Sequence, residues 1–476
     1  MREPSGLCTG LCVVGRILSR RAMLARLGAA LFGILTLALG ALQAQSLESW
    51  KIGLATTRIT PEKPMWMAGY GGRTKPAEGT LHDLWVKVLA IQAPDGGQAI
   101  VVSSDLLGFP RPLADTICRE LLDRCKLDRA RIMLTCSHTH CGPVLESALF
   151  DVYPLDDEQR ALITQYSAAL TRKIIDTAGQ SLAALQPAAL WAGEGECTFA
   201  VNRRNNTEKS LADARQRGEA PVGPMDHAVP VLACRSPDGK LLAVLFGYAC
   251  HNTTLAFQEW CGDYAGFAQL ALNQRFPGAQ TMFYIGCGAD QNPMPRRTVE
   301  LCQQYGTRLA DSVQQTLAAP MRSLRPKLRT AFEVIPLAMQ HPTREELEAS
   351  AKKKTYEARW ASRLLAELDA GKSWPATYPY PVQVWRLGDE QIWIVLCGEV
   401  VVDYSLLFKQ KYGPRTWIAG YANDVMSYIP SQRVREEGRY EAGAFAVYGL
   451  PAMRWTEQIE QQIAASVDRL VQKTNN

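Results

Sequence analysis

The pattern of apolar and polar segments along the chain predicts a mixed α/β protein. Short apolar runs that end at Gly, Pro, Asn or Asp are typical of buried strands, whereas apolar residues three and four positions apart are typical of helices. The first pattern predicts strands at 50–58, 84–92, 99–103, 132–134, 229–234, 241–250, 281–285, 391–397 and 417–420. The second predicts helices at 113–125, 157–185, 262–276, 299–318, 343–368 and 453–473, while the polar segment 199–224 reads as an ordered loop or lid. We therefore expect one large domain with a central β-sheet core flanked by helices.

Residues capable of chemistry follow several of the predicted strands directly. The apolar run 132–134 leads into Ser137-His138-Thr139-His140 and ends at Gly142-Pro143. If the strand continues past Ser137, His138 and His140 share a face, because side chains alternate between the two faces of a strand. The other residues of this kind are Asp105, His251, Asp290, Asn292 and Glu399.

Each of these residues alone has a structural explanation, since strands must end in something polar and a His-x-His pair can arise by chance. Together they favour one shared site, because ligands of α/β sheets bind beyond the carboxyl ends of the strands. Two or three histidines with a carboxylate are the composition of a catalytic zinc site.

Composition narrows the class of protein. The chain has 476 residues, of which 47% are hydrophobic and 21% charged, as in ordinary globular proteins with sizeable cores. The formal net charge of +5 is small for this length, and part of it comes from arginines near the N-terminus. We therefore predict no nucleic-acid partner.

The N-terminus has the pattern of a secretory signal peptide. A basic stretch with three arginines precedes the apolar run 27–42, and small residues offer a cleavage site near Ala44. The alternative is a membrane anchor, but the apolar run is short of the roughly 20 residues that a span needs. We predict that residues 1–44 are a signal peptide, that Met23 is an alternative start, and that the protein is exported to the periplasm or secreted.

Several motifs resemble those of the neutral (non-lysosomal) ceramidase family. They are SHTHCGP (137–143), HNTTL (251–255), the Gly-Glu of CGEV (397–400), ANDVMSYIPS (422–431) and GRYEAGAFAVYG (438–449). The likeness extends to Thr60-Pro61, MAGYGGR (67–73) and Asn202-Arg203, and it covers most of 52–451 in order and spacing.

The resemblance implies a zinc site and a role for each residue around it. It places the zinc ligands at His138, His251, Glu399 and Tyr428. It implies that His140 is the general base for the zinc-bound water, that Tyr440 donates to the oxyanion and that Arg203 positions the substrate. Such a zinc ion lowers the pKa of its water to about 7 and polarises the amide carbonyl. The alternatives are that His140 only orients a ligand, that Arg203 and Tyr440 make ordinary loop contacts, and that Tyr428 packs in the core.

Two departures from the family's pattern matter for the chemistry. The family's GDVSPN segment is GADQNP here (288–293), so that Asn292 stands where the family has a serine once considered as a nucleophile. A serine nucleophile is therefore not available at this position, whereas attack by a zinc-activated water does not need one. We also expect the catalytic domain, residues 45–476, to stand without the family's C-terminal immunoglobulin-like domain.

The function predicted from the sequence is zinc-dependent hydrolysis of an N-acyl bond in a small-molecule or lipid substrate. The sequence is also compatible with peripheral contact between the protein and a membrane. A second hypothesis keeps the zinc chemistry but replaces the sphingolipid by another amide or an ester. A third is a zinc-stabilised binding protein, which would have no use for His140 and Tyr440 as base and donor. A serine hydrolase is disfavoured, because no GxSxG turn follows a strand. The sequence does not predict the oligomeric state.

Overall fold

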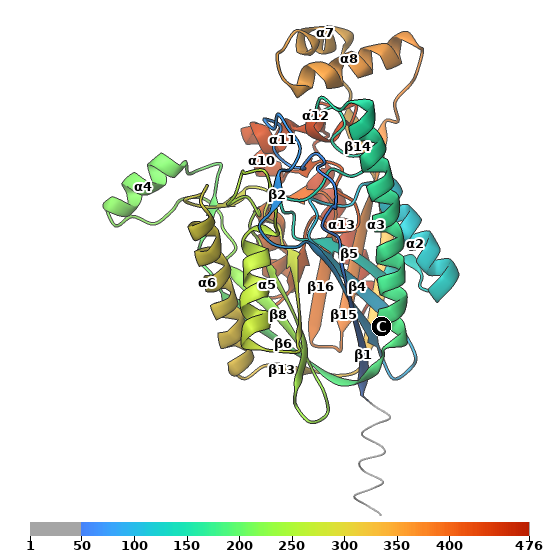
Figure 1. The fold of residues 1–476 in the computed structure, drawn as a ribbon, viewed down its shortest axis with the longest axis vertical. Coiled ribbons are helices and arrows are strands. Elements are labelled where there is room, and N and C mark those ends of the chain that lie inside the picture. Colours follow the sequence, from blue (N-terminus) through green and yellow to red (C-terminus); the bar gives the residue numbers. More distant parts are fainter. Residues whose placement is uncertain (1–48, 476) are drawn as a thin grey trace, which may run out of the picture. The chain divides into compact units, whose positions relative to one another are not determined.

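Two β-sheets lie face to face in the computed structural model, which describes residues 49–475 (Figure 1). The predicted signal peptide, residues 1–44, lies outside the described residues. In spatial order the first sheet consists of β11 (Gln280–Ile285), β9 (Leu241–Tyr248), β8 (Ala228–Arg235), β6 (Gln186–Glu196), β1 (Trp50–Arg58), β3 (Trp85–Gln92), β4 (Gln98–Ser104) and β5 (Ile132–Cys136), with β13 (Arg322–Leu324) beside β6. The second consists of β18 (Trp417–Ala419), β16 (Gln391–Leu396), β15 (Thr377–Leu387), β14 (Leu328–Gln340) and β20 (Arg454–Trp455).

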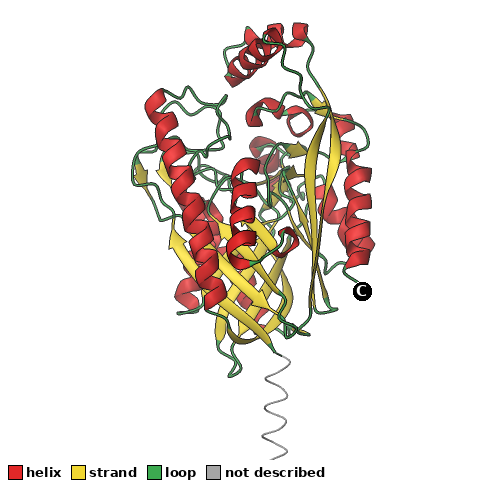
Figure 2. Ribbon diagram, turned by 90° about the vertical axis from the view of Figure 1, so that its right-hand side faces the viewer, coloured by secondary structure: helices red, strands yellow, loops and turns green. Residues whose placement is uncertain are grey.

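Helices cover the outer faces of both sheets, as Figure 2 shows. Those on the first sheet are α2 (Arg111–Cys125), α3 (Asp157–Ala183), α5 (Asp263–Arg275) and α6 (Val299–Ala318), and those on the second are α9 (Val402–Tyr412) and α13 (Ile459–Lys473). The chain from Trp50 onward forms a single compact unit. The predicted fold class, a mixed α/β domain with a central sheet core flanked by helices, is therefore confirmed.

The space between the sheets is filled by large aromatic side chains. Trp50 of the first sheet and Trp385, Trp393 and Trp417 of the second are each at most 1% exposed. The ring of Trp393 meets the rings of Trp385 and Trp417 edge to face, at centroid distances of 6.3 and 5.6 Å. Edge-to-face packing is a preferred geometry for aromatic pairs and adds to the stabilisation from apolar burial. The ring of Tyr284 of the first sheet lies 4.9 Å from that of Trp393, so the aromatic layer also connects the two sheets.

Strand β3 shows why the apolar runs read as buried strands. Its side chains alternate between the cluster on the helix side, which contains Val88 and Ala90, and the cluster between the sheets, which contains Leu89 and Ile91. Both faces of the strand are buried, so that apolar residues occur without polar alternation.

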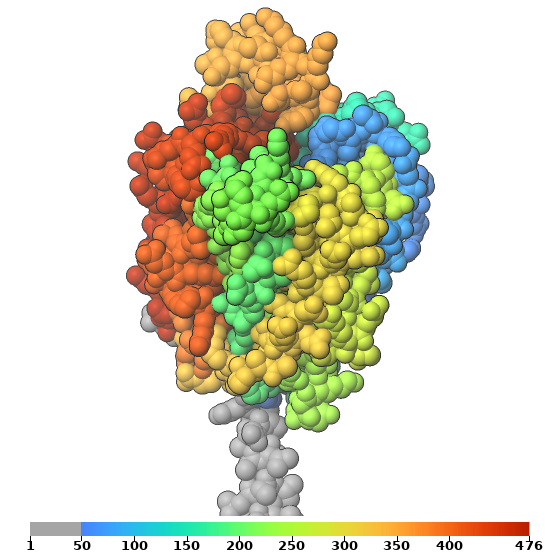
Figure 3. Space-filling model, turned by 90° about the vertical axis from the view of Figure 1, so that its left-hand side faces the viewer, coloured from blue at the N-terminus to red at the C-terminus, as the bar shows by residue number. Residues whose placement is uncertain are grey.

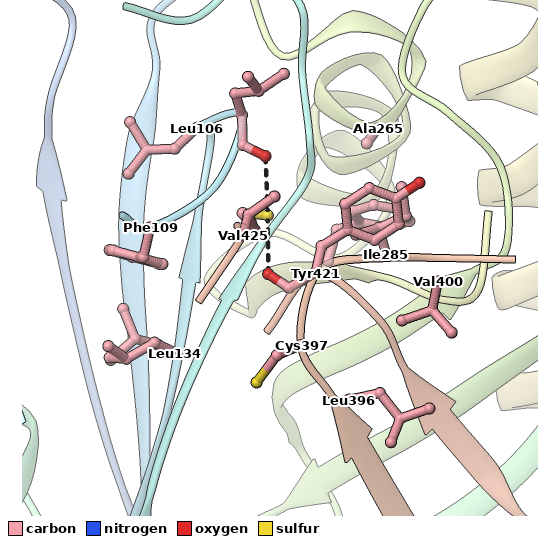
Figure 4. Packing of buried hydrophobic residues seen from close by; sticks show 14 of the residues in the cluster. Leu106, Phe109, Leu134, Ala265, Ile285, Leu396, Cys397, Val400, Tyr421 and Val425 are labelled. Atoms are coloured by element: carbon pink, nitrogen blue, oxygen red, sulfur yellow. Dashed lines mark hydrogen bonds between the residues drawn. The ribbon is translucent and has the colours of Figure 1, made fainter. Parts of the chain in front are cut away.

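The carboxyl ends of strands from the two sheets meet at one end of the domain. Figure 4 shows Leu134 of β5 and Leu396 of β16 near Leu106 and Tyr421, which follow β4 and β18. The thiol of Cys136 lies within hydrogen-bond reach of the carbonyl of Tyr421, at 3.6 Å, and so links the two sheets there. Residues that follow these strands are thereby gathered, as the strand-end pattern predicts.

Three of the predicted segments differ in the structure. The helix predicted over 343–368 is two helices, α7 (Arg344–Ala351) and α8 (Tyr356–Asp369), which fold back so that Trp360 packs against Leu347. The segment predicted as a loop over 199–224 contains β7 (Ala200–Asn202), which pairs with β12 (Gln291–Pro293), and the helix α4 (Glu208–Gln216). The last helix begins at Ile459 and not at 453, because the preceding residues form β20.

The remaining elements are short. They are β2 (Gly79–Thr80), which pairs with β10 (Glu259–Trp260), β17 (Glu399–Val400), which pairs with β19 (Tyr428–Ile429), the 3-10 turn η1 (Arg129–Arg131), and the helices α10 (Gln432–Glu437), α11 (Tyr440–Gly443) and α12 (Phe445–Tyr448). Within residues 49–475, no helix is both long and apolar enough to cross a membrane.

The contact between α3 and β1 gives a test of the fold. A Cβ added at Gly53 of β1 would lie 1.8 Å from the carbonyl oxygen of Ser181 in α3, so that the helix would have to move off the sheet. We expect Gly53→Ala to lower the free energy of unfolding by about 3 kcal/mol, measured by urea denaturation. Gly179→Ala, within α3, is the matched control: nothing lies within 4 Å of its added Cβ, and we expect a gain of about 0.5–1 kcal/mol. Equal effects of the two changes would contradict this packing.

Candidate active site

Two short backbone pairings bring the predicted site residues together. Thr139 forms a parallel bridge with Asn252, so that the segments after β5 and β9 run side by side. This brings the histidines on either side of Thr139 close to the histidine that precedes Asn252. In the second pairing, Glu399 of β17 lies directly opposite Tyr428 of β19. Residues about 260 positions apart in the chain thus meet at one site.

The backbone at His138 differs from the prediction. β5 ends at Cys136, and His138 has a φ of 56°, in the left-handed region that residues other than glycine rarely adopt. Strand alternation therefore does not explain why His138 and His140 come together, and the prediction was wrong about the cause. The turn brings them together instead, with their Nε2 atoms 3.2 Å apart. Backbone strain of this kind is typical of functional sites, where the surrounding structure holds it in place.

Four buried side chains converge on one point. The ring nitrogens of His138, His140 and His251 lie within 4.8 Å of one another. Oε2 of Glu399 lies 3.0 Å from Nε2 of His251 and 3.5 Å from Nε2 of His138. None of the four residues is more than 8% exposed. The cluster is thus a compact set of nitrogen and oxygen atoms shielded from bulk water.

The orientation of two of these rings is fixed by backbone carbonyls. Nδ1 of His138 lies 2.6 Å from the carbonyl oxygen of Leu107, and Nδ1 of His251 lies 2.7 Å from that of Gly288. A carbonyl can only accept, so each Nδ1 carries the proton and donates. Each Nε2 therefore presents a lone pair toward the centre of the cluster, as in most histidines that bind metals.

Burial keeps these histidines neutral. It lowers the pKa of His138 to about 3, although the nearby Glu399 opposes this shift. Burial also lowers the pKa of His140 and of His251 well below the usual value, and the charge of Arg203 adds to both shifts. The neutral imidazole is the form that binds a metal ion.

The donor atoms of the cluster fit a bound cation. Nε2 of His251 and Oε2 of Glu399 are buried and have no hydrogen-bond partner among the described residues. Since both atoms are acceptors, their approach to 3.0 Å is unfavourable without a positive charge between them. Each unsatisfied buried acceptor costs about 1–3 kcal/mol. Imidazole nitrogens combined with a carboxylate form a donor set that suits zinc.

Arg203, Tyr428 and Tyr440 lie together beside this cluster. Nη2 of Arg203 donates to the hydroxyl of Tyr428 at 3.3 Å, and Nε donates to Glu441 at 2.8 Å. The guanidinium lies 5.9 Å from the ring centroid of Tyr428 and 5.7 Å from that of Tyr440. Tyr440 is 49% exposed and thus lies at the mouth of the site. All seven residues proposed from the sequence are therefore gathered in one place.

Several neighbours of the cluster were not predicted. The hydroxyl of Tyr448 donates to Oε1 of Glu399 at 2.6 Å. The ring of Tyr421 lies 4.3 Å from that of His138, and the ring of Tyr70 lies 4.7 Å from that of His140. Tyr70 and Tyr448 do lie in the motifs 67–73 and 438–449, which is the only indication of them in the sequence.

Other strand-end residues hold loops and do not reach the cluster. Asp105 accepts from the backbone N–H of Trp85 at 3.0 Å, and Asp290 accepts from that of Val402 at 2.8 Å. Oδ1 of Asn292, at the position of the family's serine, lies 3.3 Å from the hydroxyl of Thr253 and 3.4 Å from Nη1 of Arg203. An amide oxygen here orients Arg203 and cannot act as a nucleophile.

Comparison with known proteins supports the likeness at the level of fold. The sequence matches none of the known protein families, and it matches none of the curated proteins. Among solved structures, the neutral ceramidase from Pseudomonas aeruginosa is similar with a TM-score of 0.68 and 18% sequence identity, over 89% of this chain and 74% of that chain. A ceramidase complexed with C2 is similar with a TM-score of 0.67 and 17% identity, over 89% of this chain and 76% of the other. The resemblance predicted from the motifs is thereby confirmed for the fold: the described chain has the architecture of the neutral ceramidases.

Proposed function

We propose that this protein is a zinc-dependent hydrolase that cleaves the amide bond of an N-acyl lipid or a related N-acyl compound. The observation that carries the proposal is the convergence of four side chains: buried acceptor atoms of His251 and Glu399, which have no hydrogen-bond partner within residues 49–475, meet the ring nitrogens of His138 and His140. A purely structural site would leave these polar atoms unsatisfied at a cost in stability. The ceramidase fold favours N-acyl substrates.

The ligands we propose are His138, His251, Glu399 and Tyr428. The two histidines present fixed lone pairs, and Glu399 contributes Oε2, while its Oε1 is held by Tyr448. Tyr428 lies opposite Glu399 across the β17–β19 pair, on the side of Arg203. Zinc bound at these residues would polarise the amide carbonyl and lower the pKa of a water molecule to about 7.

We assign the role of general base to His140. A ligand histidine usually donates its second ring N–H to a fixed acceptor. His138 and His251 do so, but Nδ1 of His140 has no hydrogen-bond partner among the described residues. No backbone carbonyl therefore fixes the tautomer of the His140 ring, whose Nε2 lies 3.2 Å from Nε2 of His138. This suits a group whose Nε2 takes a proton from water as the C–O bond forms and returns it to the nitrogen as the C–N bond breaks.

Tyr440 and Arg203 complete the proposed machinery. Desolvation of its hydroxyl and the nearby Glu399 raise the pKa of Tyr440, so its phenol stays protonated and can donate to the oxyanion of the tetrahedral intermediate. Arg203 is held by Glu441 and Asn292, and its charge stays fixed beside Tyr428. It can bind the polar part of a substrate without reorganising. Export of the protein, which the N-terminal sequence supports, also belongs to this proposal.

Metal content tests the proposal directly. The purified protein is expected to hold about one zinc ion per chain, and His251→Ala and Glu399→Ala are each expected to lose it, together with hydrolysis of N-acyl substrates, ceramide first. His227→Ala is the matched control, because its ring contacts the carbonyl of Ala200 and is not part of the cluster. Zinc that stays equal in all four proteins, as measured by mass spectrometry of the metal, would refute the assignment.

A second prediction separates the base from the ligands. His140→Ala is expected to keep its zinc while kcat falls by about 10²–10⁴-fold, the usual contribution of a general base. Zinc content and steady-state kinetics are measured on the same preparation. Loss of zinc in this variant would make His140 a ligand instead.

A third prediction concerns Tyr448, which the motifs did not single out. Its hydroxyl holds Oε1 of Glu399, so Tyr448→Phe is expected to weaken zinc binding by about 10–100-fold, as is typical when the partner of a metal ligand is lost. Competition with a chelator measures the affinity. Tyr404→Phe is the control, because this buried tyrosine donates to the carbonyl of Pro430 at 3.2 Å. An unchanged affinity in Tyr448→Phe would show that Glu399 does not depend on this bond.

A further inference from the structure

A cavity lined by arginines opens beside Arg203 and Tyr440. It has a volume of about 430 Å³, and its wall includes Arg203, Arg204, Arg296, Arg439, Tyr440 and Asn292. Figure 3 shows this face, with the green segment that carries α4 between the red segment near the C-terminus and the yellow segment around 290–320. Because Arg203 contacts Tyr428, the cavity borders directly on the proposed metal site.

The positive charge in the cavity is only partly balanced. Arg204 is paired with Glu437 at 2.9 Å and with Glu441 at 2.5 Å, and Arg296 lies 3.0 Å from Glu208. Glu441 is shared, since it also pairs with Arg203 at 2.8 Å.

The fourth arginine of the wall, Arg439, differs from the other three. In residues 49–475, Arg439 forms no ion pair, and its Nη1 donates instead to the carbonyl of Arg204 at 2.8 Å. The four arginines of the wall are therefore balanced by three glutamates, Glu208 and Glu441 of the wall and Glu437, which pairs with Arg204.

The backbone conformation of Arg439 indicates that its guanidinium has a function. Its φ of 68° and ψ of −162° lie in a region that is almost restricted to glycine. A side chain at such a position is strained, and a glycine there would relieve the strain. The arginine nevertheless precedes Tyr440, the proposed oxyanion donor, and holds its guanidinium against Arg204 at the cavity wall. Strained residues of this kind persist where the surrounding structure holds them, and they cluster at active sites and ligand-binding sites.

We propose that this cavity binds an anionic group of the substrate, a carboxylate or a phosphate next to the scissile amide, through Arg439 and Arg203. The inference rests on the proposed function, which it narrows to acidic N-acyl compounds such as N-acyl amino acids. Arginine suits this role because its planar fork of donors matches the two oxygens of a carboxylate or the oxygens of a phosphate. Ceramide carries no such charge and would leave Arg439 without a partner.

Binding of matched pairs of ligands tests the inference independently of hydrolysis. One pair is N-lauroylglycine, which ends in a carboxylate, and N-lauroylglycinamide, which ends in a neutral carboxamide. The second pair is N-lauroyl phosphoethanolamine, which ends in a phosphate, and N-lauroylethanolamine, which ends in a hydroxyl. For calorimetry, analogues in which CH2 replaces the amide NH prevent turnover. The wild-type protein is expected to bind the anionic member of at least one pair about tenfold more tightly, as one charge-assisted hydrogen bond implies. The pair with the larger ratio distinguishes a carboxylate from a phosphate.

Variants connect the preference to this cavity. Arg439→Gln is expected to lower the anionic-to-neutral ratio about tenfold, and Arg439→Lys is expected to restore part of it, because the charge returns without the planar fork. Arg119→Gln, an exposed arginine on α2, is the control and should leave the ratio unchanged. The preference should also weaken as salt is added, since ions screen an exposed charge.

The outcomes separate this inference from the proposed function. Equal binding of both members of both pairs, or a ratio that Arg439→Gln leaves intact, would overturn the anion site even if both amides are hydrolysed. A preference in binding that depends on Arg439, in a protein that hydrolyses neither amide, would uphold the anion site and refute the hydrolase.

Discussion

The site depends on the contact of two imidazole rings with two backbone carbonyls, those of Leu107 and Gly288. Each carbonyl accepts a hydrogen bond from Nδ1–H of its histidine, so that Nε2 is left as an acceptor that faces Glu399. The two carbonyls belong to the segments that follow β4 and β11, and both of these strands are buried in the core of the first sheet. The orientation of these two rings is therefore fixed by the packing of the core.

The two sheets contribute different parts of the site. His138 and His140 follow β5 of the first sheet, whereas Glu399 follows β16 of the second and is aligned with Tyr428 by a parallel pair. The donor set is complete only when the sheets are packed, so binding of a cation and folding of the domain are thermodynamically linked. The aromatic layer around Trp393 joins the two sheets, since the ring of Tyr284 of the first sheet lies 4.9 Å from that of Trp393, and it thereby affects the geometry of a site to which it contributes no ligand.

The sequence predicted the central strands and several helices because these segments have a clear period or an apolar run, as in α6. The motifs indicated the candidate site residues, and the strand-end pattern predicted that His138, His251 and Glu399 lie close together, as they do in the structure. It failed where tertiary contacts override local pattern. The fold-back of α7 and α8 depends on Trp360 packing against Leu347, which no local period reveals. Tyr448 was missed because a tyrosine among apolar residues has the pattern of a core residue. Its hydrogen bond to Glu399 joins residues that are distant in the sequence, so no local pattern reveals it.

Arg203 lies between the proposed metal site and the arginine cavity. On one side it donates to Tyr428, and on the other it pairs with Glu441 at the wall of the arginine cavity. Asn292, which replaces the serine of the ceramidase pattern, lies against Arg203 at this junction. The departure from the family's motif thus falls outside the cluster of His138, His251 and Glu399, on the side where a substrate would be selected. Substitutions around Arg203 can change which substrate binds while the buried donor atoms stay the same. The reason is that the proposed metal site and the arginine cavity share only the guanidinium of Arg203 and the rings beside it.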